Sequence, residues 1–250
     1  MNKCLSLTLF LLISIPSMSQ KPQIINIGNT EVELKFFKGS ILSDVIFLNV
    51  HEDEQTSIEA IQEIRNSIPV DFAYLHHNGN RNIDFELGKK KFEFDPNRIY
   101  TFKGRRATLK KFGKFSFRAN KEVKKLDQAI NDLIANYKIV VTLHNNTDVN
   151  YTIKSYDVGG DESENTKDLN IVDTWDADDF IYTTHQPYFS ECKKRGLNVI
   201  LQDNDACVND GSLSVHCGIN SIPYINVEAQ KGHLKEQIEL IRIIIDLLSN

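Results

Sequence analysis

Two nearly uninterrupted apolar segments constrain the fold of this chain more than any other feature. They are Val45–Val50, which reads VIFLNV, and Ile139–Leu143, which reads IVVTL. A strand without polar alternation is buried on both faces, and such strands belong to parallel sheets that helices cover on both sides. Helical apolar spacing occurs between the two segments, at Ile58–Ile68 and Lys121–Asn136. The pattern predicts an α/β fold with a mixed, largely parallel central sheet.

Residues 20–250 are predicted to form a single domain, since no repeat and no Pro/Gly/Ser-rich linker divides them. Its 41% hydrophobic and 25% charged residues are those of an ordinary globular protein. Further strands are predicted at Thr30–Phe37, Val70–Leu75, Phe180–Thr183, Val199–Leu201, Leu213–Cys217 and Tyr224–Val227, a hairpin at Asn82–Glu86 and Lys91–Phe94, and a final helix from Gly232 to Leu248.

The first nineteen residues have the pattern of a secretory signal peptide. Lys3 precedes an apolar run from Leu5 to Ile15, Pro16 ends this run, and small residues lead to a predicted cleavage after Ser19. The run is about half of the ~20 residues that span a bilayer as a helix, so no stable membrane span is expected. The sequence therefore predicts export to the periplasm or secretion, with a membrane-tethered N-terminus as the alternative.

Charge and cysteine content narrow the classes of partner and scaffold. The net charge of −5 argues against a general nucleic-acid binder, which carries a basic field. The lysine-rich stretches Lys89–Lys91 and Arg105–Lys114 are predicted to be a solvated hairpin and loop, although they can attract an anionic polymer. Export permits disulfides, and Cys207 and Cys217 flank a turn-rich segment across which they can pair, which leaves Cys192 over.

Candidate metal ligands follow the apolar runs. His51 and Glu54 come after the first run, His144 comes after the second, and Glu228 directly follows the late strand. In parallel sheets, ligands bind beyond the carboxyl ends of the strands, where these residues emerge. Two imidazoles and a carboxylate suit a catalytic Zn²⁺ with an open position for water, and Glu228 can serve as a general base. The alternative is that the acidic residues only offset a helix dipole and that His144 is structural.

A third element is the turn Asp95-Pro96-Asn97-Arg98. Pro96 stiffens it, and the planar guanidinium of Arg98 can hold a carboxylate through two parallel hydrogen bonds. Asn97 can donate one more. The sequence thus indicates a clamp for an anionic substrate group, with a solvated surface turn as the alternative.

The order of these motifs resembles the zinc carboxypeptidase superfamily, and it is most similar to the branch of aspartoacylase and succinylglutamate desuccinylase. The resemblance lies in the segments HEDE, DPNRIY, LHNNT and VEAQ, in that order along the chain. It implies a carboxypeptidase-like three-layer sandwich and one zinc ion. For single residues it implies zinc ligation by His51, Glu54 and His144, a substrate carboxylate on Asn97 and Arg98, general-base catalysis by Glu228, and Arg81 as the best candidate for the arginine that polarises the scissile carbonyl.

The resemblance further implies a hydrolase that cleaves an amide bond beside a free carboxylate, either as an N-acyl amino acid deacylase or as a carboxypeptidase. Two alternatives remain: an enzyme acting on cell-wall stem peptides, and a non-catalytic zinc-binding or peptide-binding module. One departure from the family is Glu52-Asp53 in place of Gly-Asn, which predicts a more acidic pocket mouth. His76 and His77 are expected to be a solvated pair.

Overall fold

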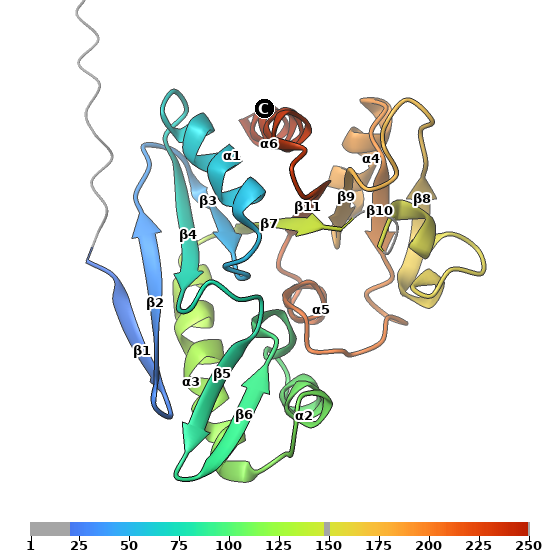
Figure 1. Cartoon of the computed structure of the whole chain (residues 1–250). Helices are drawn as coiled ribbons and strands as arrows, with labels where there is room; N and C mark the ends of the chain where they lie inside the picture. The colour runs from blue at the N-terminus through green and yellow to red at the C-terminus, as the bar shows by residue number, and fades with distance from the viewer. Residues whose placement is uncertain (1–20, 148–150, 250) are drawn as a thin grey trace, which may run out of the picture.

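A nine-stranded mixed sheet forms the centre of the molecule within residues 21–147 and 151–249, which the computed structural model describes (Figure 1). Its strand order is β1-β2-β4-β3-β7-β11-β9-β10-β8, and β5 and β6 form a separate hairpin. The strands are β1 (Gln23–Ile27), β2 (Thr30–Phe37), β3 (Ile41–Asn49), β4 (Val70–His76), β5 (Ile83–Leu87), β6 (Lys90–Phe94), β7 (Ile139–Asn146), β8 (Thr166–Asn170), β9 (Phe180–Thr183), β10 (Val199–Gln202) and β11 (Tyr224–Gln230).

The four central strands, β4, β3, β7 and β11, run parallel to one another. Antiparallel pairs lie toward the edges, where β2 joins β4, β9 joins β11, and β8 joins β10. The two apolar runs are the centre of this parallel group, since they form β3 and β7. The predicted mixed sheet with a parallel centre is therefore confirmed.

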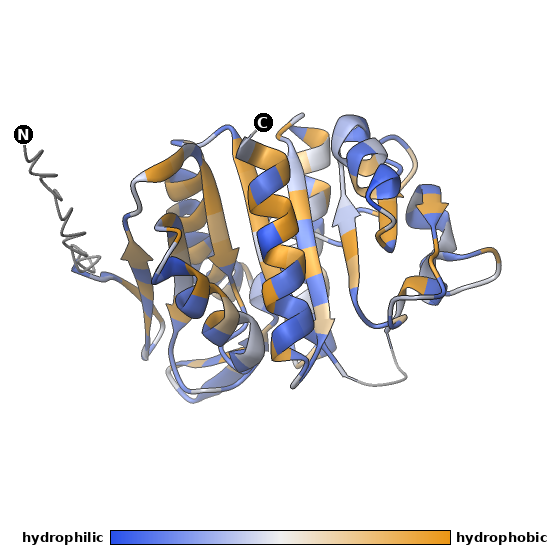
Figure 2. Cartoon of the chain, turned by 90° about the horizontal axis from the view of Figure 1, so that it is seen from above, coloured by the Kyte–Doolittle hydropathy of each residue, from blue (hydrophilic) through white to orange (hydrophobic). Residues whose placement is uncertain are grey.

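Helices cover both faces of the sheet and complete three layers (Figure 1). Apolar residues of α1, α4 and α6 form one core with the sheet, and those of α2, α3 and α5 form the other. Figure 2 looks onto the molecule from above and shows that its helices mix hydrophobic and hydrophilic residues, as helices packed on one side only must. The helices are α1 (Gln55–Arg65), α2 (Phe102–Lys111), α3 (Phe117–Ile134), α4 (Gln186–Lys194), α5 (Leu213–Ile219) and α6 (Leu234–Ser249).

The predicted strand at Leu213–Cys217 is wrong, because this segment is helix α5. Ser212 caps the helix by accepting a hydrogen bond from the backbone N–H of Val215, and a short apolar run has no period that separates strand from helix. The preceding Gly211 has a φ of +84° and lies so close to Gly104 of α2 that a Cβ on either residue would sit 2.4 Å from the other's Cα. This close approach fixes the start of α5 beside the turn at residues 95–98.

Three further expectations are corrected or remain open. Most of the lysine-rich stretch predicted as a loop is helix α2, which Thr101 caps through the N–H of Gly104. The three cysteines among the described residues are free thiols, so the suggested pairing of Cys207 with Cys217 is not formed. The predicted signal peptide lies outside the described residues. Within them, no helix is both long and apolar enough to cross a bilayer.

Candidate metal centre

The parallel centre of the sheet brings together three segments that are far apart in the sequence. His51 follows the end of β3, and His144 and Glu228 lie near the carboxyl ends of β7 and β11. Glu228 pairs in register with His144, and β3 is the other parallel neighbour of β7. Because side chains alternate between the faces of a strand, His144 and Glu228 both point toward the layer that contains α3 and α5.

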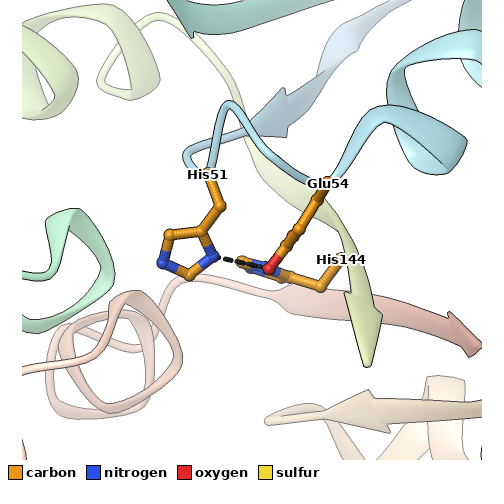
Figure 3. Close-up of side chains that lie close together, drawn as sticks. All are labelled: His51, Glu54 and His144. Carbon is orange, nitrogen blue, oxygen red and sulfur yellow. Dashed lines mark hydrogen bonds and ion pairs between the residues drawn. The ribbon is translucent and has the colours of Figure 1, made fainter. Parts of the chain in front are cut away.

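His51, Glu54 and His144 converge at one point, as Figure 3 shows. The Nδ1 atom of His51 lies 2.8 Å from Oε1 of Glu54 and 3.2 Å from Nδ1 of His144. The second carboxylate oxygen of Glu54 lies 2.8 Å from the same Nδ1 of His144. All three residues are buried. Donor atoms at these separations can share one ion, whose bonds to nitrogen and oxygen would be about 2.0–2.2 Å long.

The first two ligands of this cluster, His51 and Glu54, lie in the turn before α1. Glu54 is the N-terminal cap residue of α1, but its carboxylate forms no capping hydrogen bond. It points to the histidines instead, so its position is not explained by the helix dipole. The backbone N–H of Glu54 bonds to the carbonyl of His51, and the Ser57 hydroxyl bonds to the carbonyl of Glu54. These two bonds fix the turn.

Asp95, the first residue of the turn Asp95-Pro96-Asn97-Arg98, orients His51. Its Oδ1 atom lies 2.8 Å from Nε2 of His51, the ring nitrogen that faces away from the cluster. The same oxygen accepts the backbone N–H of Asn97, which shapes the turn. A carboxylate that holds the outer nitrogen of a histidine fixes its tautomer and its direction toward a metal. Only the fold could reveal this role, since 44 residues separate the two side chains.

The charges of the cluster support one another. Burial lowers the pKa of His51, but Glu54 and Asp95 outweigh it and raise this pKa to about 9. Burial likewise opposes ionisation of Glu54, yet His144 and His51 hold the pKa of its carboxyl well below the usual range. Without a metal, the cluster is therefore the Glu54 carboxylate beside the His51 imidazole, which attracts a proton. A divalent cation would take the place of that proton.

Glu228 reaches the same centre from β11 and is held by a buried hydrogen-bonded chain. The side-chain Nδ2 of Asn226 donates to Oε1 of Glu228 at 3.0 Å, and the Thr142 hydroxyl donates to the side-chain Oδ1 of Asn226 at 3.0 Å. The Tyr224 hydroxyl lies 2.5 Å from that of Thr142. Burial, together with the charge of nearby Glu54, raises the pKa of Glu228. A buried carboxylate with a raised pKa is suited to accept a proton.

A cavity of about 400 Å³ opens over these groups, and the remaining predicted site residues line it. Arg98 bonds through Nε to Asp210 at 3.2 Å, and Oδ1 of Asn97 accepts the backbone N–H of Leu213 at 3.1 Å, which leaves the amide Nδ2 to donate. Arg81 is half-exposed and donates to Oε1 of Glu54. The structure thus places all seven predicted residues at one centre, six on the cavity wall and His51 directly behind it.

Glu52 is the exception among the acidic residues near this centre, because it turns away from the cavity. Its Oε2 atom accepts the backbone N–H groups of His77 and Gly79, each at 2.7 Å, and Oε1 contacts the His76 ring. Glu52 therefore ties the turn that holds the metal ligands to the loop that carries Arg81. The expected solvated pair of histidines is also wrong for His77, whose side chain is fully buried.

Comparison with known proteins supports the fold. No protein-family model matches the chain, and no curated protein matches it in sequence. Among solved structures, murein-tripeptide amidase MpaA from Escherichia coli O157 aligns with a TM-score of 0.52 and 13% identity, over 95% of this chain and 94% of that one. A metallo-carboxypeptidase from Burkholderia cenocepacia aligns with a TM-score of 0.50 and 10% identity, over 94% and 65%. A succinylglutamate desuccinylase/aspartoacylase from Rhodobacter sphaeroides aligns at 0.43 and 11%, over 87% and 58%.

These likenesses extend over nearly the whole described chain, and they establish that it has a carboxypeptidase-like fold. The fold expected from the order of the sequence motifs is thereby confirmed. What the chain catalyses is a separate matter, because a fold hosts more than one chemistry and function depends on the site.

Proposed function

We propose that this protein is a zinc-dependent hydrolase that cleaves an amide bond adjacent to a free carboxylate. The observation that supports this most directly is the convergence of His51, Glu54 and His144, with Glu228 beside them at the floor of one cavity. Two imidazoles and a carboxylate are a common ligand set of catalytic zinc, and they leave a position for water. A zinc ion held there would supply a Lewis acid to the carbonyl and acidify water near it.

The other residues of the cavity have complementary roles in this mechanism. Glu228 accepts the proton of the attacking water and returns it to the leaving amine, since it is the buried carboxylate with a raised pKa. Arg81 lies beside Glu54 and stabilises negative charge on the carbonyl oxygen. Arg98 and the free amide donor of Asn97 bind the substrate carboxylate. Together, these cavity residues bind the substrate, orient it and transfer the proton.

The size of the cavity favours a small or chain-terminal substrate. A volume of about 400 Å³ lies within the range of pockets that hold single small molecules. An N-acyl amino acid or the end of a short peptide fits this description. The structural likeness to a murein-tripeptide amidase supports a cell-wall stem peptide as the second candidate, and export of the protein, which we propose from residues 1–19, would bring it to that substrate.

A substitution of the general base tests the proposal. Glu228→Gln keeps the size of the side chain but cannot accept a proton, so turnover should stop while stoichiometric zinc remains bound. His51→Ala should lose the zinc as well. Turnover is measured on N-acyl amino acids and on stem peptides as the appearance of a new free amine. Retained turnover in Glu228→Gln contradicts the mechanism, and a parent protein that binds zinc but cleaves neither class indicates a binding module.

A further inference from the structure

Basic residues are concentrated in one segment of this acidic chain. Residues 102–125 contain ten of the 29 lysines and arginines but one of the 34 acidic residues, although the net charge of the chain is −5. The segment comprises α2, the first turns of α3 and the connection between them. None of the proposed catalytic or metal-binding residues lies in it. The hydrolase function therefore does not account for this distribution.

Most of these basic side chains are exposed on the two helices. Eight of them form no ion pair within the described residues, and the ninth exposed one, Lys125, pairs with Glu122. The exception in the segment is Arg105, which is buried and bonds to Asp127 of α3 and to the carbonyl of Ile99. Arg105 holds α2 and α3 together as a rigid pair. The eight side chains are those of Lys103, Arg106, Lys110, Lys111, Lys114, Arg118, Lys121 and Lys124.

A cluster of phenylalanines lies among these charges, where the two helices meet. Phe115 of the connecting turn packs edge-on against Phe102 of α2 and Phe117 of α3, with ring centroids 6.2 and 5.3 Å apart. The guanidinium of Arg106 lies 5.9 Å from the centre of the Phe115 ring. Phe117 is 76% exposed and Phe102 is 49% exposed. Exposed apolar clusters of this kind in a folded protein mark contact surfaces.

We propose that this basic aromatic face, formed by the eight cations with Phe102, Phe115 and Phe117, docks the protein on an anionic phospholipid membrane. Lysine and arginine side chains are attracted to anionic headgroups, and apolar side chains between them enter the boundary between headgroups and acyl chains. The turn between α2 and α3 lies at an extremity of the molecule, next to the end of the β5–β6 hairpin (Figure 1). A protruding element can enter a flat interface without a clash from the rest of the fold.

A lipid surface fits this face better than a single-stranded nucleic acid does. Bases stack on open ring faces. The three rings here pack edge to face on one another, which covers part of those faces and leaves apolar bulk exposed. Insertion into an interface requires only such bulk. The occupant to which both the charge and the ring geometry are complementary is thus an anionic membrane.

Vesicle co-sedimentation tests the proposal. The protein should bind vesicles that contain phosphatidylglycerol, bind pure phosphatidylcholine vesicles far more weakly, and dissociate as salt is raised. Each lysine near an anionic surface contributes about fivefold in affinity, so Lys114→Gln combined with Lys121→Gln should weaken binding about 25-fold. Phe117→Ser should also weaken it and remove the part that resists salt. Every variant carries the same N-terminus as the parent, so any contribution of residues 1–19 is common to all.

Matched controls come from elsewhere on the surface. Lys167 and Lys235 are exposed lysines outside the face, and Val158 is an apolar side chain that is 99% exposed. Lys167→Gln combined with Lys235→Gln, and Val158→Ser, should bind vesicles like the parent. Equal weakening by the control pair of lysines, or equal binding to neutral and anionic vesicles, would each overturn the proposal. It would also be overturned if Phe117→Ser bound vesicles like the parent and bound a single-stranded DNA oligonucleotide tightly. The test does not depend on whether the protein is a hydrolase.

Discussion

Replacement of Asp95 tests whether the His51–Glu54–His144 cluster is a metal site, because Asp95 contacts this cluster through His51. Its Oδ1 atom holds Nε2 of His51 and the N–H of Asn97, both at 2.8 Å. Loss of a carboxylate that orients a metal-binding histidine costs 10- to 100-fold in metal affinity, or about 1.4–2.7 kcal/mol. We expect this loss for Asp95→Ala.

Asp95→Asn separates charge from geometry. Its amide oxygen can still accept both hydrogen bonds, but a bond to a charged acceptor is about twice as strong as a neutral one, so roughly half of the free-energy loss should remain. Zinc affinity is measured by competition with a chromogenic chelator at constant pH. Asp53→Asn removes a charge from the neighbouring metal-binding turn without a contact to His51 and should bind zinc like the parent.

If Asp95→Ala binds zinc as tightly as the parent, or if Asp53→Asn weakens zinc binding equally, Asp95 does not orient a metal ligand. A folding control is needed for the alanine variant, because Asp95 also caps the 3-10 turn at Pro96–Arg98. Loss of such a cap costs about 1 kcal/mol of stability. Thermal unfolding of the metal-free proteins measures this contribution separately from zinc affinity.

Three further outcomes follow from the contacts of the site. Glu52→Ala removes the acceptor of two backbone N–H groups, so it should cost about 1.5–3 kcal/mol of stability. It should also lower kcat/KM, because these bonds hold the loop that carries Arg81, and a variant with parental kcat/KM would contradict this link between Glu52 and Arg81. Activity should fall on the acid side of the pH profile as Glu228, whose pKa is raised by burial, becomes protonated. Asn226→Leu should move this acid limb to higher pH, because it removes a hydrogen bond to the charged form of Glu228. An unmoved acid limb would show that Asn226 does not act on the general base. Cys207 should be the first cysteine of the described chain to react with a thiol reagent at pH 8. Burial raises the thiol pKa of all three cysteines, but Cys207 is only partly buried whereas Cys192 and Cys217 are fully buried, so early modification of those two would contradict the packing.

The strands and helices that build the cores were predictable because their apolar spacing follows from the local chain. Strand β9 lies where its apolar run predicts, and the helical spacing before β7 corresponds to α3. The failures have local causes too. At Leu213–Cys217 the run is too short to show a period, and the cap at Ser212 decides for a helix. In α2 the many lysines and arginines leave no apolar spacing from which a helix could be predicted, because only a few of its residues face the core.

The candidate site was predictable to a similar extent. Which residues emerge at the ends of apolar runs is a local property of the chain, and it was enough to identify His51, Glu54, His144 and Glu228 as candidates. How these residues meet depended on the tertiary structure, because parallel pairing of β3, β7 and β11 sets the register that places Glu228 beside His144. The tertiary structure also decided that Asp95 lies against His51, that Glu52 faces away, and that the lysines of α2 and α3 share a face with exposed rings. Such contacts depend on long-range packing, which local spacing does not encode.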